Sequence, residues 1–216
     1  MGDGVRVMKV LIMNYNRLRL SANLADWVAK RGCEPVFVDN HSTYSPLLDY
    51  YNHCPYQVLI MDKNYNNRVI WEQNVLKVLG ITGRYIVTDP DLDLTGIPDD
   101  FEKILSGGLN KYPRFNKCGF SLEINDVTNS SIYCEGKTIR EWESQFWTRP
   151  LDDLYFEAWI DTTFAMYNSA TFTMEGIRTN RPYTARHVPW YYKEIPEDEK
   201  YYFQSANGNS TIKNIL

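Results

Sequence analysis

The first hundred residues alternate between short apolar runs and longer segments in which apolar residues recur every three or four positions. This alternation is typical of parallel strands joined by crossover helices. We therefore predict buried strands at residues 10–13, 35–38, 58–61 and 85–88. The segments between them predict helices at residues 21–31, from residue 45 where Pro46 takes the first helical position, and at residues 70–79.

The rhythm changes in the second half of the chain. There the pattern predicts a helix at 99–105, a strand at 118–124, a helix at 138–147 and a strand at 158–167. No stretch rich in Pro, Gly or Ser separates the halves. We therefore predict a single α/β domain, residues 1–216, in which residues 111–216 form a mixed lobe laid on residues 1–110.

Polar side chains follow the four predicted strands of the first half. These are Asn14 to Arg17, Asp39 with Asn40, Asn64, and Asp89 with Asp91. In open α/β sheets ligands bind beyond the carboxyl ends of the strands. We therefore expect these four polar clusters to converge on one crevice.

The segment Asp89-Pro90-Asp91-Leu92-Asp93 is the most informative of these clusters. In an extended segment the three carboxylates point to one side, and such close like charges raise one another's pKa. A hard cation, Mg²⁺ or Mn²⁺, would relieve the repulsion and bridge to phosphate oxygens. The alternative is a solvated acidic turn, but the position directly after a buried strand favours the metal site.

Composition narrows the function classes. With 23 Lys and Arg against 27 Asp and Glu, the chain has no basic excess for binding nucleic acid. The four cysteines show no paired spacing, which predicts free thiols rather than a zinc site or disulfides. No apolar run approaches the about 20 residues of a membrane span, and no secretory leader is evident. These features predict a cytoplasmic protein.

The successive motifs of the first half carry a family resemblance. The segment 9–17, ending in Asn14-Tyr15-Asn16-Arg17, the segment 38–43 and the segment 87–91 resemble, in order and spacing, the nucleotide-binding motifs of glycosyltransferase family 2 and its GT-A relatives. The second half is similar, more loosely, to glycosyltransferase domains of large DNA viruses, of the chlorella virus type, and of phages. For a viral chain, the cytoplasm would be that of the host.

The resemblance implies a GT-A fold, with a Rossmann-like, mostly parallel sheet flanked by helices, and a hexosyltransferase activity. The donor would be a nucleotide-diphosphate sugar, a UDP-sugar above all, and the acceptor a glycan or glycoprotein. The expected nucleotide-sugar-binding residues are Asn14, Asn16, Arg17, Asp39, Asn64, Arg68, Asp89 and Arg186. Asp91 and Asp89 would hold Mn²⁺ or Mg²⁺, and His187, in a segment similar to the late histidine of many GT-A enzymes, would complete the metal shell.

The catalytic base is where the chain departs from the family pattern. No Glu-Asp pair precedes a Gln-x-x-Arg-Trp segment, and residues 141–147 are only distantly similar. Asp161 is the first candidate for a base that takes the acceptor proton. Glu143 and Asp126 come next, and each of the three could instead be a cap or a solvated carboxylate. The stereochemical outcome therefore stays open.

Three other classes of protein share some of these sequence features. A sugar nucleotidyltransferase also uses strand-end carboxylates, but it would need a Gly-rich phosphate loop, and Asn14 to Leu18 contain no glycine. A catalytically inactive nucleotide-sugar-binding module would not need the intact Asp89 and Asp91. A response-regulator-like domain has no need for the long second half.

Overall fold

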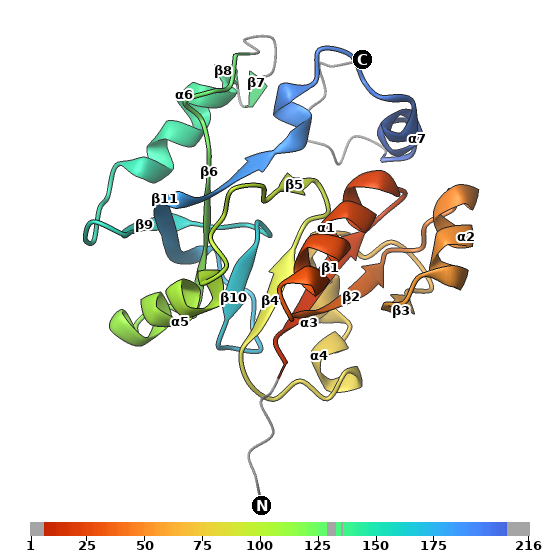
Figure 1. Ribbon diagram of the computed structural model, residues 1–216, viewed down its shortest axis with the longest axis horizontal. Helices are drawn as coiled ribbons and strands as arrows, with labels where there is room; N and C mark the ends of the chain where they lie inside the picture. The colour runs from red at the N-terminus through yellow and green to blue at the C-terminus, as the bar shows by residue number, and fades with distance from the viewer. Residues whose placement is uncertain (1–6, 129–132, 135, 207–216) are drawn as a thin grey trace, which may run out of the picture.

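The computed structural model describes residues 7–128, 133–134 and 136–206. In this part of the chain one nine-stranded sheet runs in the order β3-β2-β1-β4-β10-β6-β11-β5, with β9 paired to β11 (Figure 1). Its strands are β1 (Lys9–Asn14), β2 (Glu34–Asp39), β3 (Gln57–Ile60), β4 (Tyr85–Thr88), β5 (Leu92–Asp93), β6 (Lys117–Leu122), β9 (Tyr155–Trp159), β10 (Ala165–Tyr167) and β11 (Glu175–His187). A separate short hairpin joins β7 (Tyr133–Cys134) to β8 (Lys137–Thr138).

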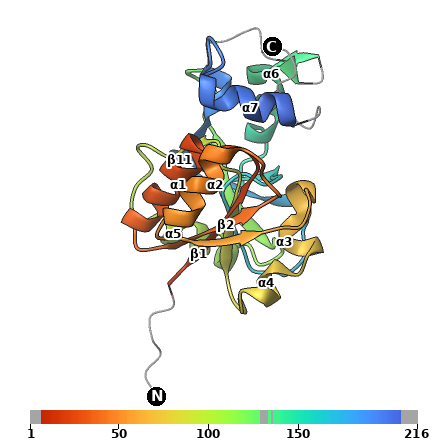
Figure 2. The same cartoon turned by 90° about the vertical axis from the view of Figure 1, so that its right-hand side faces the viewer.

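The helices of the described residues cover both faces and one end of the sheet (Figure 2). They are α1 (Arg19–Lys30), α2 (Ser45–His53), α3 (Val69–Glu72), α4 (Val75–Val78), α5 (Phe101–Lys111), α6 (Ile139–Ser144) and α7 (Glu197–Ser205). Short 3-10 helices lie before α3 at Asn66–Arg68, after α6 at Gln145–Trp147 and after β11 at Val188–Tyr191. Within these residues no helix has both the length and the apolar character that crossing a membrane requires.

Pairing in the sheet is mixed. Strands β3, β2, β1 and β4 are parallel, and β6 is parallel to β11. Strand β10 lies antiparallel between β4 and β6, while β9 and β5 pair antiparallel with β11. The predicted α/β class, a central sheet flanked by helices with mixed pairing in the second half, is confirmed.

Burial on both faces of the sheet explains why β1, β2 and β4 could be predicted from the sequence. Val10 and Ile12 belong to the core shared with α1, α2 and α5. Leu11 and Met13 face the core shared with α3 and α4. Because successive residues of a strand point to opposite faces, a strand covered on both sides reads as an unbroken apolar run.

Several predicted elements differ from the structure. The strand predicted as buried at 58–61 is the edge strand β3, and its Ile60 is 55% exposed. The helix predicted at 70–79 is broken into α3 and α4, because Asn74 adopts a left-handed conformation with φ of 54°. The strand predicted at 158–167 is two strands, β9 and β10, which lie in different parts of the sheet. The helix predicted at 99–105 extends as α5 through Gly107 and Gly108, and α7 was not predicted.

Candidate functional site

A cavity of about 510 Å³ opens where β1 and β4 end. It brings together seven of the residues predicted from the sequence: Asn14, Arg17, Asn64, Asp89, Asp91, Asp161 and His187. The expected convergence of strand-end residues is therefore found for these side chains. The biochemical roles assigned to them stay predictions.

The loop after β1 is fixed by its own amide side chains. Asn14 Nδ2 donates to the carbonyl oxygen of Arg17 at 2.8 Å and to the Tyr51 hydroxyl at 2.8 Å. Asn16 has φ of 53°, and its Oδ1 accepts hydrogen bonds from the backbone N–H groups of Thr43 and Tyr44. Asn16 is buried beneath the loop and does not line the cavity. Its side chain shapes the loop that presents Asn14 and Arg17.

Asp39 is fully buried and does not line the cavity either. Its Oδ1 accepts from the Ser42 backbone N–H at 2.7 Å, and its Oδ2 accepts from the Ser42 hydroxyl and the Tyr51 hydroxyl. These bonds hold the turn after β2 in place. The neighbouring Asn40 lines the cavity instead, and base recognition by Asp39 stays a prediction.

The two aspartates after β4 differ in their surroundings. Burial, together with the charges of Asp91 and Asp161, raises the pKa of Asp89 to about 7. Asp89 Oδ2 accepts from the Thr162 hydroxyl at 2.9 Å. Burial would also raise the pKa of Asp91, but His187 and Arg17 outweigh it and hold that pKa well below its usual range. The surroundings thus favour the protonated form of Asp89 and the ionised form of Asp91.

Asp93 does not join this pair. It lies in β5, and its Oδ1 accepts from the Thr95 backbone N–H at 2.8 Å. It is not among the residues that line the cavity. The expectation that three alternating carboxylates face one side is therefore wrong for Asp93, because its carboxylate turns back to the following loop.

The side chains after β4 offer the oxygen and nitrogen atoms that a divalent cation such as Mn²⁺ prefers. Asp91 Oδ1 is buried and has no hydrogen-bond partner among the described residues, and the same is true of His187 Nδ1. Asp91 Oδ2 is taken by Arg17 Nη1 and lies 3.2 Å from His187 Nε2. In the described residues no group of three or more His, Cys, Asp or Glu side chains is arranged to hold a metal. The carboxylate donors are Asp91 Oδ1 and Asp89, whose Oδ2 also accepts from Thr162, and ligation by His187 stays a prediction.

Asp161 enters the cavity from the turn between β9 and β10. Its carboxylate accepts from Asn67 Nδ2 at 3.0 Å. Behind the turn, the buried Lys117 donates from Nζ to the carbonyl oxygens of Ile160 and Asp161. Burial raises the pKa of Asp161, and the charges of Lys117 and Arg68 oppose the rise. Arg68 itself lies over the Phe172 ring and does not line the cavity.

The remaining candidates lie outside the cavity. Glu143 is buried in an ion pair with Arg178, although burial raises its pKa. Asp126 accepts from Arg186 Nε at 2.8 Å and from the Tyr191 hydroxyl at 2.7 Å. Glu143, Asp126 and Arg186 are thus engaged with partners of their own.

Several cavity residues were missed by sequence reasoning. They are Met13, Asn66, Asn67, Thr162, Tyr202 and Ala206, while Tyr15, Asn40 and Pro90 were named only as parts of motifs, without a role as site residues. Tyr15 follows β1 directly, and its position there was a usable signal for an aromatic surface beside a bound base. Tyr202 and Ala206 come from α7 and the residue after it. Nothing local in the sequence marks them, because their partners are far away in the chain.

Comparisons with known proteins add little. No protein-family model and no curated protein matches the chain. Three solved structures with a similar arrangement of elements each share 10% sequence identity with it. The structure of HddC from Yersinia pseudotuberculosis has a TM-score of 0.47 over 78% of this chain and 84% of that one.

An apo UDP-glucose pyrophosphorylase has a TM-score of 0.41, over 81% of this chain and 74% of that one. A protein described as mannose-1-phosphate geranyltransferase from Thermus thermophilus has a TM-score of 0.40, over 98% and 67%. A likeness this weak carries no argument about activity.

Proposed function

We propose that the chain is a metal-dependent glycosyltransferase that moves a hexosyl group from a UDP-sugar to a glycan or glycoprotein acceptor. The observation that carries the proposal is the pair Asp89 and Asp91 at the end of β4, in a cavity large enough for a nucleotide. Within the described part of the chain, no group forms a hydrogen bond with the buried Oδ1 of Asp91. The proposal places the reaction in the cytoplasm, which for a viral chain is that of the host.

The charge of the cavity favours a cation. Three carboxylates, those of Asp89, Asp91 and Asp161, line it together with one guanidinium, that of Arg17. An anionic diphosphate would be repelled by this set unless a divalent cation entered with it. Mn²⁺ or Mg²⁺ held by Asp89 and Asp91 would supply Lewis-acid stabilisation of the leaving diphosphate.

The protein side chains would take the acceptor proton and position the group that takes it. In the transfer, the acceptor hydroxyl oxygen forms a bond to the anomeric carbon while the bond from that carbon to the diphosphate oxygen breaks. Asp161 takes the proton of the acceptor hydroxyl, and its raised pKa makes it a better base than an ordinary aspartate. The bond from Thr162 to Asp89 ties the base-carrying turn to the end of β4.

A sugar nucleotidyltransferase is the alternative, and the UDP-glucose pyrophosphorylase among the compared structures is an enzyme of that kind by its printed name. Such an enzyme would join a nucleoside triphosphate to a sugar phosphate and release pyrophosphate. The loop after β1 disfavours this reaction. It contains no glycine, and its cation, Arg17, is already bound to Asp91 and Glu199. A binding module without activity is the other alternative.

The test is calorimetric titration of UDP, GDP and dTDP into the protein, with and without Mn²⁺. Asp91→Ala is expected to abolish metal-dependent binding of the preferred nucleotide. Asp93→Ala, the matched control, removes a neighbouring carboxylate that does not line the cavity and is expected to leave binding intact. Absence of nucleotide binding to the unaltered chain under every condition would refute the proposal.

Product analysis then separates the three activities. Release of UDP from a UDP-sugar with Mn²⁺ supports glycosyl transfer. Formation of pyrophosphate from UTP and a sugar 1-phosphate would instead identify a nucleotidyltransferase. Metal-dependent binding without either product would identify a binding module.

A further inference from the structure

Arg17 lies between two buried carboxylates. Its Nη1 donates to Asp91 Oδ2, and its Nε lies 3.0 Å from Oε2 of Glu199 on α7. Arg17 is 3% exposed and Glu199 is 0% exposed. One guanidinium cannot neutralise two carboxylates, so Arg17, Asp91 and Glu199 together carry one negative charge when both carboxylates are ionised, and His187, 3.2 Å from Asp91 Oδ2, is the other group of positive influence that faces Asp91.

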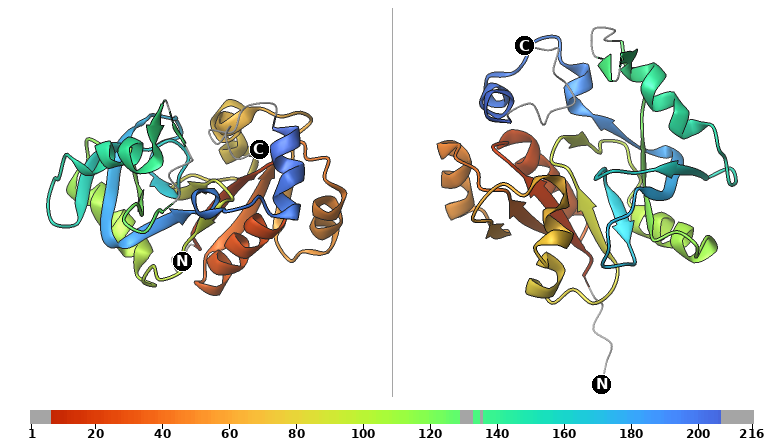
Figure 3. Two further views of the ribbon diagram at one scale, coloured as in Figure 1. Left: turned by 90° about the horizontal axis from the view of Figure 1, so that it is seen from above. Right: turned by 180° about the vertical axis from the view of Figure 1, so that it is seen from behind.

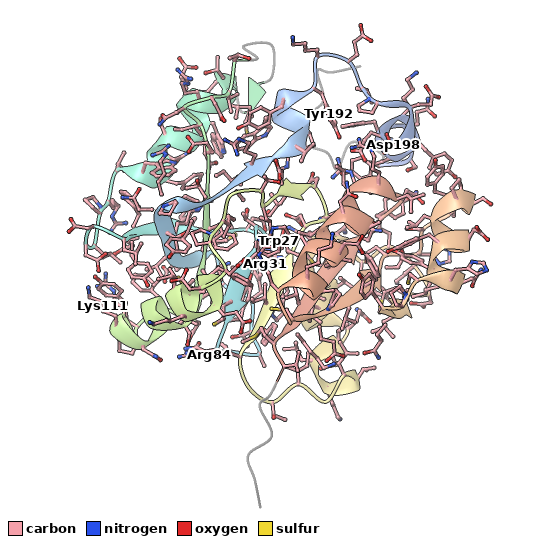
Figure 4. All side chains as sticks on the ribbon, in the orientation of Figure 1. Trp27, Arg31, Arg84, Lys111, Tyr192 and Asp198 are labelled. Atoms are coloured by element: carbon pink, nitrogen blue, oxygen red, sulfur yellow. The ribbon has the colours of Figure 1, made fainter. Side chains whose placement is uncertain are left out.

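Helix α7 holds Glu199 at this position. The Tyr202 ring lies under the Arg17 guanidinium, 3.6 Å from its central carbon. Asp198 pairs at 2.7 Å with Arg19, the first residue of α1, and α7 lies next to this end of α1 (Figures 3 and 4). The Ser205 hydroxyl accepts from Asn16 Nδ2 at 2.9 Å. Glu199 is therefore anchored and cannot turn to solvent without undocking the helix.

The uncompensated charge has a consequence for Asp91. If Glu199 carried no charge, Arg17 and Asp91 would form a closed neutral pair, which has little attraction for a further cation. With Glu199 ionised, Arg17 is shared, and the unpartnered Oδ1 of Asp91 stays in a negative environment. The nearby charges that act on Glu199 are those of Arg17, Asp91, Asp198 and Arg19.

We infer that Glu199 is a positioning residue that balances Arg17 and thereby keeps Asp91 able to bind a divalent cation. This inference rests on the proposed function. It assigns to α7 a part in metal and donor binding.

The inference predicts effects of opposite sign. Removing the charge of Glu199 lessens the repulsion of an anionic diphosphate, so UDP should bind as well or better without metal. The same change weakens the attraction of Mn²⁺ for Asp91, so metal-supported binding should become weaker. If Glu199 merely held α7 in place, its loss would weaken binding in both conditions.

The experiment compares Glu199→Gln with Glu197→Gln. Glu197 lies on the same helix, paired to Lys200 with its side chain 86% exposed, and its substitution removes the same charge. The measurements are made at pH 8, because burial raises the pKa of Glu199 to about 6 and the group is ionised there. Calorimetry follows Mn²⁺ alone, UDP alone and UDP at several Mn²⁺ concentrations.

We expect Glu199→Gln to raise the Mn²⁺ concentration for half-saturation by at least about tenfold, since a unit charge acts on a divalent ion at low effective dielectric. Glu197→Gln is expected to match the unaltered protein. Glu199→Asp, which keeps the charge, is expected to restore most of the Mn²⁺ affinity, and circular dichroism checks that each variant is folded.

An unchanged Mn²⁺ dependence in Glu199→Gln would overturn the inference, as would an equal loss of UDP affinity with and without metal. If UDP does not bind to the unaltered protein but Mn²⁺ affinity still depends on Glu199, the proposed function fails and the inference stands. If Mn²⁺ binds neither protein, both are overturned.

Discussion

Gly107 and Gly108 are neighbours in α5, yet replacing each by alanine is expected to have opposite effects on stability. A Cβ on Gly108 would lie 2.8 Å from Cys118 Sγ, 2.9 Å from Tyr155 Cε1 and 3.0 Å from Ile177 Cδ1. A Cβ on Gly107 would meet only the Tyr155 hydroxyl, at 3.5 Å, which is an ordinary contact. The pair therefore separates helix propensity from packing.

The expected magnitudes follow from these distances. Alanine stabilises a helix interior by about 0.8–1 kcal/mol relative to glycine, and Gly107→Ala should gain most of that. Gly108→Ala gains the same propensity but must push apart three buried neighbours, which typically costs about 1–3 kcal/mol or more. Tyr155 cannot easily yield, because its hydroxyl donates to the Ile104 carbonyl oxygen at 2.7 Å. We expect a net destabilisation of about 1–2 kcal/mol for Gly108→Ala.

Urea titration followed by circular dichroism measures both variants against the unaltered protein. The difference between them of roughly 2–3 kcal/mol corresponds to several degrees in Tm for a chain of this size. If Gly108→Ala proved as stable as Gly107→Ala, the close approach of α5 to β6 and β11 would be contradicted.

Three further predictions concern other buried groups. Phe164→Ala should lose about 3–5 kcal/mol of unfolding free energy in urea titration, because its fully buried ring stacks on Phe120 at 4.9 Å; a loss below about 1 kcal/mol would contradict this. Burial lowers the pKa of the Lys117 ammonium group from 10.5 to about 7. Between these two pH values the unfolded chain binds a proton at Lys117 that the folded protein has released. The free energy of unfolding should therefore rise with pH over this range. Lys117→Met should remove up to about 1.4 kcal/mol per pH unit of that rise, and parallel stability curves for the two proteins at about pH 7 to 9 would refute it. The Cys118 thiol, whose pKa burial raises, should resist iodoacetamide in the folded protein while the half-buried Cys54 reacts, as read by mass spectrometry; native labelling of Cys118 would count against its burial.

The sequence pattern was informative where burial is two-sided and contacts are local. The runs of β1, β2 and β4 are apolar throughout because helices cover both faces of the sheet. The polar residues after β1 and β4 reached one cavity because parallel strands end at one edge. The orientation of the Asp39 side chain could not be predicted from the strand pattern, because it depends on hydrogen bonds with Ser42 and Tyr51.

The break between β9 and β10 and the helix α7 could not be predicted from the sequence, because both are defined by contacts with residues far away in the chain. The turn between β9 and β10, residues 160–164, contains no glycine or proline, and its two ends, Ile160 and Phe164, are buried, so the sequence does not mark the break. Helix α7 has a mostly polar surface and buries Glu199 and Phe203, so apolar periodicity is weak. Its place is set by Arg17, Arg19 and Asn16 at the other end of the chain.

The position of β10 has a consequence for the order of folding. Its Ala165 pairs with Val87 of β4 on one side and Gly119 of β6 on the other, so a late segment fills the middle of the sheet. During synthesis the strands of the first half must wait for residue 165 with the edge of β4 open, and such edges invite pairing with other chains. Contacts between segments so far apart also slow folding. Expression of residues 1–110 alone should therefore yield aggregates rather than a small folded domain.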